Sequence, residues 1–263
     1  MVSNSNDTPA NADFCCYVIN LDGSTERFSQ VSVALEKAGV AFERLSAFDG
    51  RKLSLDTVAD YDAAAARRYM GRELVGGEIG CYYSHLNAAK AFLRTDRSYC
   101  LVIEDDAAPH EALQAIVTET IGFLNAHDPD WRIVNMGNEK LKIFRPLKTM
   151  SFGKNIFTLC SAHYFPMTTG AILWSRKGAQ EFVDGHRVIF APVDNFFRYW
   201  ITRVGGGYSF FPRPVSTTDA VSDIAHPGKI SRSRNARSFL YGLRKQRRLM
   251  VDKLIAAKRK YFS

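Results

Sequence analysis

The chain has 263 residues, with 46% hydrophobic and 24% charged side chains, so it can bury a substantial core as a soluble globular protein. No apolar run approaches the roughly 20 residues that a membrane-spanning helix needs, and the polar first residues lack the apolar stretch of a secretory signal. The five cysteines are scattered and form no CxxC pair, which argues against a zinc cluster and favours reduced thiols. We therefore expect a cytoplasmic protein.

The net charge of +8 is concentrated at one end of the chain. Residues 229–263 hold twelve Lys or Arg residues and one acid, a charge of +11, which leaves 8 − 11 = −3 for the rest. The basic tail therefore needs an explanation of its own, separate from that of the body.

The first elements predict a strand, a helix and a strand. Residues 14–21 are a short apolar run typical of a buried strand, and residues 25–38 carry apolar side chains at helical spacing before Gly39. Residues 40–48 then favour a second strand, followed by the turn signal Asp49-Gly50. This order and spacing predict a βαβ unit and hence a parallel sheet.

The rest of the chain continues to alternate strands and helices. Residues 53–72 are polar and alanine-rich, which indicates a helical insertion. We predict a long helix at 78–93, strands at 99–103, 131–136, 157–165 and 171–174, and helices at 176–183 and 195–204. The whole pattern predicts one α/β domain over residues 14–228, after a disordered polar N-terminus (1–13) and before the basic tail (229–263).

Three carboxylates, Glu104, Asp105 and Asp106, directly follow the buried strand at 99–103. In open α/β sheets, ligands bind beyond the carboxyl ends of the strands. Adjacent like charges repel one another, so the cluster needs a counter-charge, and Mg²⁺ and Mn²⁺ favour carboxylate oxygens. Alternate residues of a strand project the same way, so Glu104 and Asp106 can share one ion. The alternative is a solvated acidic turn or a helix cap before Pro109.

Several segments, in family order, resemble glycosyltransferase family 25, which includes lipopolysaccharide and lipooligosaccharide galactosyltransferases. They are Val18-Ile19-Asn20-Leu21 with Arg27, Ala47-Phe48-Asp49-Gly50, Gly77-Glu78-Ile79-Gly80-Cys81 with Ser84-His85-Leu86, Leu101-Val102-Ile103-Glu104-Asp105-Asp106-Ala107, Thr169-Gly170-Ala171 with Ser175-Arg176-Lys177-Gly178-Ala179, and Pro192-Val193-Asp194. The chain departs from the family at Phe28, where a second arginine usually follows the one matched by Arg27.

The resemblance implies a GT-A-like fold with a Rossmann-like, mostly parallel sheet. It also implies a UDP-sugar donor, UDP-galactose in many members, a Mn²⁺ or Mg²⁺ ion, and inversion at the anomeric carbon. The implied acceptor is a saccharide of lipopolysaccharide or lipooligosaccharide.

The residues expected at the nucleotide sugar are Asn20, Leu21, Arg27, Asp49, Ser84 and Asp105. Arg27 fits a pairing with the diphosphate through its planar fork, and it also fits an ordinary helix arginine in solvent. Asp49 fits a contact with ribose or uracil, and equally a residue that only stabilises an Asp-Gly turn.

Inverting transfer in a single displacement needs a group that removes the proton of the acceptor hydroxyl. Asp194 is the first candidate for this general base, followed by Glu78 and His85. A helix N-cap would also explain Asp194, and a structural histidine would explain His85. The expected metal ligands are Glu104 and Asp106, with His226 as a candidate third ligand.

The basic tail carries apolar residues at helical spacing with Lys and Arg between them, namely Phe239, Leu243, Met250, Leu254 and Ile255. Such an amphipathic helix fits an anionic membrane surface, a nucleic acid, or packing on the body. The membrane surface is favoured, because a lipid-linked acceptor would lie at the inner leaflet. We expect a peripheral protein on the inner face of the cytoplasmic membrane. We expect no nucleic-acid partner, since the body lacks a nucleic-acid-binding motif and is slightly acidic.

The sequence leaves two other functions open. One is the same machinery with another donor, such as UDP-glucose or a UDP-amino sugar. The other, of a different class, is a nucleic-acid-binding protein that uses the basic tail. The intact acidic cluster argues against a catalytically inactive sugar-binding relative, and the sequence contains no phosphate-loop, dinucleotide-binding or HExxH motif.

Overall fold

The structure is a computed structural model that describes residues 13–218 and 241–262. Three features predicted from the sequence lie wholly or mostly outside these ranges. They are the polar N-terminus, His226 and the first part of the basic tail, up to residue 240.

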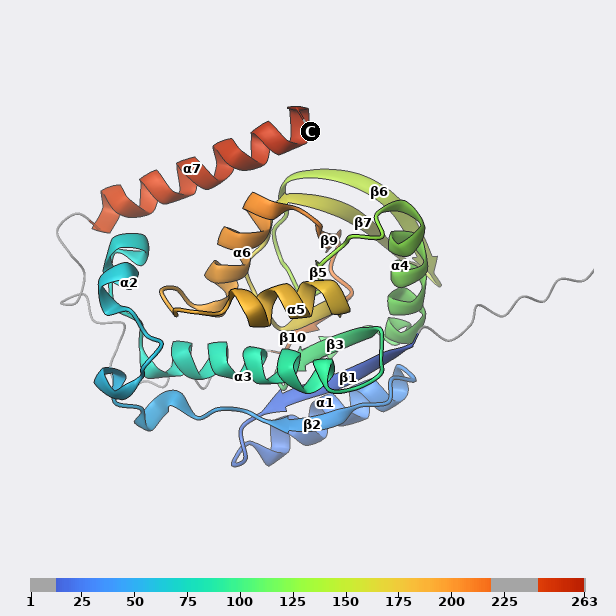
Figure 1. Cartoon of the computed structure of the whole chain (residues 1–263). Coiled ribbons are helices and arrows are strands. Elements are labelled where there is room, and N and C mark those ends of the chain that lie inside the picture. The colour runs from blue at the N-terminus through green and yellow to red at the C-terminus, as the bar shows by residue number, and fades with distance from the viewer. Residues whose placement is uncertain (1–12, 219–240, 263) are drawn as a thin grey trace, which may run out of the picture.

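An eight-stranded mixed sheet with the order β2-β1-β3-β8-β5-β9-β7-β6 forms the centre of the molecule (Figure 1). Its strands are β1 (Phe14–Asn20), β2 (Glu43–Ser46), β3 (Tyr99–Glu104), β5 (Ile133–Asn135), β6 (Lys142–Phe152), β7 (Asn155–Tyr164), β8 (Ala171–Ser175) and β9 (Gly207–Phe211). Strand β1 pairs in parallel with β2 and β3, and β5 pairs in parallel with β9. Strands β7 and β8 run antiparallel to both of their neighbours. The other six strands therefore share one direction, and the predicted α/β class is confirmed.

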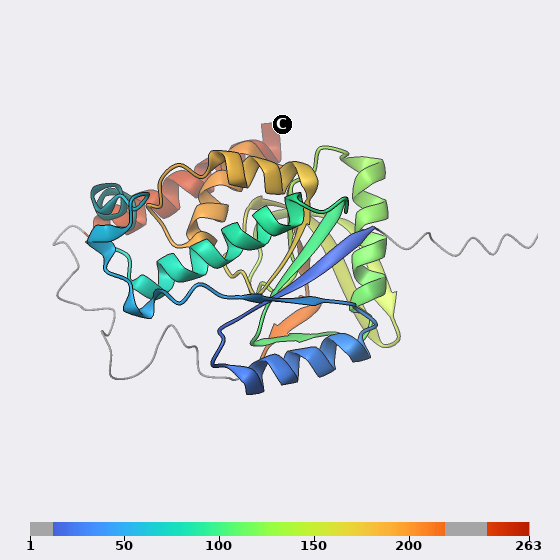
Figure 2. The same ribbon diagram turned by 60° about the horizontal axis from the view of Figure 1, so that its bottom comes forward.

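Helices cover both faces of the sheet (Figures 1 and 2). One face packs against α2 (Ala63–Met70), α3 (Gly76–Leu93), α5 (Arg176–Gly185) and α6 (Val193–Val204), and the other against α1 (Thr25–Lys37) and α4 (Leu113–His127). Along β1, Tyr17 and Ile19 enter the first core, while Cys16 and Val18 enter the second. A strand that is buried on both faces has apolar residues at successive positions, which is why β1 can be predicted from the sequence.

A small two-stranded sheet fixes the chain just after the acidic cluster. Strand β4 (Ala107–Pro109) pairs antiparallel with β10 (Val215–Thr217). The backbone N–H of Thr218 then donates to the carbonyl oxygen of Asp106 at 2.8 Å. The backbone of Asp106 is therefore held in place by β4, which follows it directly, and by the residue that follows β10.

Helix α7 (Tyr241–Phe262) lies along the outside of the molecule and contacts α2, α6, β6 and β7 (Figure 1). Its inward face carries Asp252 and Ala256, which are buried, and Asp252 Oδ1 pairs with Arg203 Nη2 at 2.8 Å. Its outward face carries Leu243, Met250 and Leu254, which are exposed. Part of the predicted apolar stripe therefore faces away from the body. Among the helices that the structure describes, none is both long and apolar enough to cross a membrane.

Two short 3₁₀ helices, η1 (Gly50–Lys52) and η2 (Leu55–Thr57), connect β2 to α2. The segment that follows them pairs with the segment before α6. Tyr61 forms an isolated parallel bridge with Ile189, and the backbone N–H of Ile189 donates to Asp60 at 2.7 Å. The predicted insertion over residues 53–72 is therefore tied to the body through its backbone.

Candidate active site

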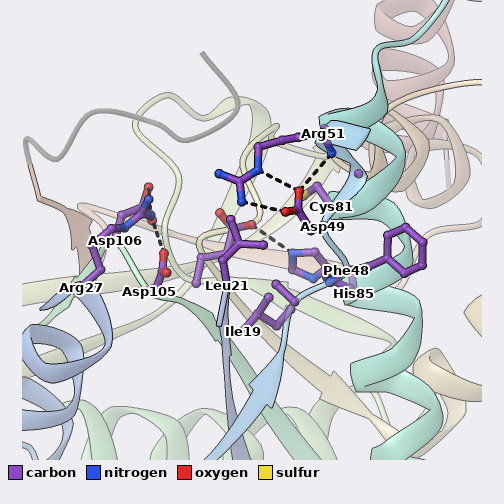
Figure 3. A pocket seen from close by; sticks show the side chains of 15 residues that line it. Ile19, Leu21, Arg27, Phe48, Asp49, Arg51, Cys81, His85, Asp105 and Asp106 are labelled. Atoms are coloured by element: carbon purple, nitrogen blue, oxygen red, sulfur yellow. Dashed lines mark hydrogen bonds and ion pairs between the residues drawn. The ribbon is translucent and has the colours of Figure 1, made fainter. Parts of the chain in front are cut away.

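A pocket of about 680 Å³, its open mouth included, lies where β1 and β3 end, beside α3 (Figure 3). Eight residues predicted from the sequence line it: Leu21, Arg27, Asp49, Ser84, His85, Glu104, Asp105 and Asp106. Seven residues to which the sequence assigned no role complete the lining: Ile19, Ala47, Phe48, Gly50, Arg51, Gly77 and Cys81. The pocket is therefore built from segments that lie far apart along the chain.

One wall of the pocket is a turn pressed against the start of α3. A Cβ on Gly50 would lie 1.9 Å from the carbonyl oxygen of Gly76, so only glycine allows this approach. The Ser84 hydroxyl accepts a hydrogen bond from the backbone N–H of Phe48 at 2.9 Å and donates to Gly80 at 2.8 Å. Ser84 lines the pocket, and its hydrogen bonds hold this turn in place.

Asp49 and Arg51 form an ion pair at the pocket (Figure 3). Asp49 Oδ1 accepts from the backbone N–H and the Nε of Arg51 at 3.0 and 2.8 Å, and Oδ2 lies 2.7 Å from Nη2. The Asp49 side chain therefore caps η1, as the turn alternative predicted. The same pair also presents a carboxylate and a guanidinium to the pocket.

Glu104, at the end of β3, has one oxygen engaged by the protein. Its Oε1 accepts from His85 Nε2 at 3.0 Å and from the Thr169 hydroxyl at 2.6 Å. Burial alone would raise the pKa of Glu104, but the hydrogen bonds from His85 and Thr169 hold it below its ordinary value. Glu104 is therefore a carboxylate at neutral pH.

Asp105 is buried, and an amide and a guanidinium hold its carboxylate in place. Its Oδ2 accepts from Asn20 Nδ2 at 2.7 Å, and its Oδ1 forms an ion pair with Arg27. Asn20 is buried as well and does not line the pocket. Asn20 therefore holds Asp105 from outside the pocket lining, and Arg27 lies against the acidic cluster.

Of the three acidic residues, Asp106 is the one whose negative charge the protein stabilises least. Its Oδ2 lies 3.6 Å from Arg27 Nη2, while its Oδ1 is buried without a hydrogen-bond partner among the described residues. Burial, together with the charges of Glu104 and Asp105, raises the pKa of Asp106 to about 6. A buried oxygen without a partner beside a second carboxylate fits a bound cation.

Cys81, His85 and Glu104 offer a sulfur, a nitrogen and an oxygen within 4.8 Å of one another. Because a carboxylate only accepts hydrogen bonds, the proton between His85 and Glu104 sits on Nε2 of the histidine. Burial, followed by the charges of Glu104 and Asp194, raises the pKa of Cys81 well above its ordinary value. A protonated thiol is a poor metal ligand, so the oxygens of Glu104 and Asp106 fit a hard cation better.

The two carboxylates predicted as general bases lie outside the pocket lining. Glu78 pairs with Arg72 through both oxygens, at 2.5 and 2.8 Å, and its Oε2 accepts from the backbone N–H of Val75 at the start of α3. Asp194 lies in the first turn of α6, where its Oδ1 accepts from the backbone and side chain of Asn195 at 2.6 and 2.8 Å. Burial raises the pKa of Asp194. The charge of Asp194 contributes to the raised pKa of Cys81, so Asp194 lies near that thiol although it is not part of the pocket lining.

The remaining site residues divide into two groups. His226 lies outside the described residues, so its distance from Glu104 and Asp106 is not defined. Thr169, Cys81 and Arg51 contact the predicted residues but carried no role in the sequence-based hypothesis. Thr169 and Cys81 belong to segments that resemble the family, which was the available signal. Arg51 follows such a segment directly.

The chain matches known proteins over most of the part that contains this site. A sequence profile described as "Glycosyltransferase family 25 (LPS biosynthesis protein)" matches residues 14–197. Procollagen galactosyltransferase 1 of Danio rerio is 26% identical over 68% of this chain and 30% of its own length. A glycosyltransferase 25 family member of Aedes aegypti is 33% identical over the same shares, 68% and 30%. The chain thus spans about 30% of the length of these relatives.

Two solved structures align with most of the chain. A glycosyltransferase involved in the glycosylation of the major capsid of PBCV-1 aligns over 90% of this chain and 98% of that protein, with 12% identity and a TM-score of 0.41. The galactosyltransferase LgtC, in complex with donor and acceptor sugar analogs, aligns over 88% and 94%, with 13% identity and a TM-score of 0.41.

Proposed function

The chain belongs to glycosyltransferase family 25, and from this premise we propose that it transfers a sugar from a UDP-sugar to a saccharide with the help of a divalent cation. The proposed sugar is galactose, because several relatives, such as that of Danio rerio, are named galactosyltransferases. The proposed acceptor is a saccharide of lipopolysaccharide or lipooligosaccharide, in line with the description of the family. The proposed stereochemical course is inversion, on the GT-A-like fold that the family resemblance implies.

The observation that carries this proposal is the acidic cluster at the end of β3. Arg27 pairs with Asp105 and Asp106, and a buried oxygen of Asp106 has no hydrogen-bond partner among the residues described. Glu104 and Asp106 would hold Mn²⁺ or Mg²⁺, with His226 as a proposed further ligand. When bound, the cation neutralises the charge that develops on the diphosphate as the sugar departs.

The other pocket residues bind and orient the nucleotide in this proposal. Arg27 brings a fixed positive charge next to the diphosphate, and Asp105 and Asn20 hold that guanidinium in position. Asp49 and Arg51 supply a carboxylate and a guanidinium for the ribose or uracil. Leu21 supplies an apolar contact beside them.

The proposed general base is Asp194. The acceptor hydroxyl gives its proton to this carboxylate while its oxygen attacks the anomeric carbon, and the bond from that carbon to the diphosphate breaks. Burial raises the pKa of Asp194, which moves a carboxylate towards the neutral range that suits a general base. Glu78 is a weaker candidate, because Arg72 and the start of α3 already occupy its oxygens. His85 is weaker too, because its Nε2 proton is donated to Glu104.

We propose further that α7 rests on the anionic inner surface of the cytoplasmic membrane. The exposed Leu243, Met250 and Leu254 share the outer side of the helix with exposed basic residues such as Arg247 and Lys258. Each basic residue near an anionic surface contributes about 1 kcal/mol, weakened by salt. Flotation with anionic and neutral vesicles tests this, with Arg247→Glu and Lys258→Glu combined. Equal flotation of the variant and the wild type would contradict the electrostatic attachment.

A hydrolysis screen tests the proposed activity itself. The protein is incubated with UDP-galactose, UDP-glucose and UDP-N-acetylglucosamine, each with Mn²⁺, Mg²⁺ or a chelator, and released UDP is measured. We expect cation-dependent release that is fastest with UDP-galactose and lost in Asp106→Asn. Release from another UDP-sugar alone would change the donor, and no release from any of them would contradict the proposal.

A further inference from the structure

A second hollow adjoins the candidate active site across the ring of Phe48. It measures about 810 Å³, its open mouth included, and Phe48 lines both hollows. The Phe48 ring is 40% exposed and its centroid lies 5.0 Å from that of Tyr83. Asp60, Tyr83 and Arg187 lie around the second hollow. A molecule seated there would therefore lie directly beside the pocket that we assign to the donor.

The carboxylate of Asp60 is held rigidly at this hollow. The Tyr83 hydroxyl donates to its Oδ1, and His186 Nε2 lies 2.9 Å from its Oδ2. The backbone oxygen of Asp60 accepts from the N–H of Ile189 at 2.7 Å, two residues after Arg187. Two side chains therefore fix the carboxylate and a backbone hydrogen bond fixes the residue that carries it, which is the arrangement that a specific polar contact needs.

Asp60 keeps the capacity to accept further hydrogen bonds. Burial alone would raise the pKa of Asp60, but the hydrogen bonds from Tyr83 and His186 lower it overall. An ionised carboxylate has about four lone-pair positions, and the protein's side chains use two of them in Asp60. Its side chain is 28% exposed, so a ligand in the hollow can reach it.

We propose that this second hollow is the acceptor subsite and that it binds a hexose ring, an inference that rests on the proposed glycosyltransferase function. A hexose has an apolar C–H face, which suits the exposed Phe48 ring, and a rim of hydroxyls, which suits Asp60 and Arg187. Ligand sites of this kind combine aromatic walls with a few fixed polar groups. Asp60 and Arg187 bring one charge of each sign to the hollow, so their charges balance and suit a neutral sugar better than a cationic acceptor such as the side chain of hydroxylysine.

Saturation-transfer NMR on the full chain with UDP and Mn²⁺ bound tests this subsite. The probes are methyl β-D-galactoside, methyl β-D-glucoside and free hydroxylysine. The variants are Asp60→Asn and Arg187→Ala, with Arg68→Ala, an exposed arginine on α2, as the matched control. Asp60→Asn disturbs a buried network, so Arg187→Ala, which changes an exposed side chain, decides the test if the first variant fails to fold.

We expect at least one glycoside to bind, and each variant to weaken its Kd by about fivefold or more, the loss of one hydrogen bond. The Kd for UDP should stay the same within about twofold, because the variants leave the donor pocket intact. Arg68→Ala should match the wild type in both measurements.

Three results would overturn the inference. They are glycoside binding that neither variant weakens, no glycoside binding to a protein that binds UDP, and binding of hydroxylysine in place of the glycosides. Failure of the wild type to bind UDP would instead remove the proposed function, and this inference with it. UDP binding therefore separates the two failures.

Discussion

Replacing Asn20 with alanine tests whether the protein itself braces the acidic cluster. The Asn20 amide donates to Asp105 Oδ2 at 2.7 Å and to the carbonyl of Ser24 at 2.9 Å, and its oxygen accepts from Arg44 Nε at 2.8 Å. A hydrogen bond to a charged group contributes about 1.5–3 kcal/mol, and a neutral one about 1 kcal/mol. The Arg44 side chain is 33% exposed, so its bond counts for less. We expect Asn20→Ala to lower the free energy of unfolding by about 3 kcal/mol.

Differential scanning calorimetry without nucleotide measures this loss. For a domain of this size about 3 kcal/mol corresponds to a fall in Tm of about 6–12 °C. The matched control is Asn155→Ala at the exposed start of β7, which should shift the Tm by about 2 °C at most. If Asn20→Ala melted as close to the wild type as the control, the side chain would not brace Asp105 and the reasoning would be refuted.

Three further substitutions probe α7, the general base and the wall of the pocket. Asp252→Ala removes the buried partner of Arg203, and because that guanidinium is 28% exposed we expect a calorimetric loss of about 2 kcal/mol, less than for a fully buried pair. An unchanged Tm would mean that α7 is not anchored there. Asp194→Asn should slow transfer by about 10²–10⁴-fold while UDP affinity stays constant. The wild-type kcat/KM should rise with pH through a pKa above that of an ordinary aspartate, because burial favours the protonated, inactive form. The same raised pKa makes the folded wild type lose stability as pH rises, so Asp194→Asn should gain stability relative to it towards high pH, as melting at several pH values would show. Gly50→Ala, whose Cβ would collide with a backbone carbonyl, should cost about 2 kcal/mol or more. Gly122→Ala, in α4 with open space around it, should add about 0.5–1 kcal/mol, and a shift of the same sign in both would refute the packing argument.

The sequence predicts best those elements whose pattern reflects burial. Strands β1 and β3 are buried on both faces and read as apolar runs, and α1 shows one apolar side. Strand β6 is not predicted, because Lys142 to Phe152 is largely exposed and contains Pro146. Helix α4 is not predicted either, although its buried residues, among them Leu113, Val117 and Leu124, recur at helical spacing, so the signal is present in the sequence. The antiparallel direction of β8 depends on the path of the chain between strands, which no local pattern contains.

The residues of the candidate site are likewise predictable where a local sequence pattern marks them, and not where only contacts between elements define their role. The acidic cluster is predictable because it directly follows a buried strand, and Arg27, Asp49 and His85 because they belong to segments or positions that resemble the family. The bracing role of Asn20 and the pairing of Glu78 with Arg72 depend on contacts between elements. Spacing along one helix cannot show such contacts. From the sequence alone, a polar residue that binds a ligand therefore cannot be distinguished from one that only holds the structure together.

Calorimetric titration of UDP, with Mn²⁺ or with a chelator, tests the central claim most directly. The claim is that Glu104 and Asp106 hold a divalent cation that in turn holds the diphosphate. We expect Mn²⁺ to raise UDP affinity by about tenfold or more in the wild type and in Asp184→Asn, an exposed aspartate of α5 that serves as the control. In Asp106→Asn the affinity should be the same with and without Mn²⁺. Equal UDP affinity in both conditions for the wild type, or a full Mn²⁺ effect in Asp106→Asn, would contradict the claim.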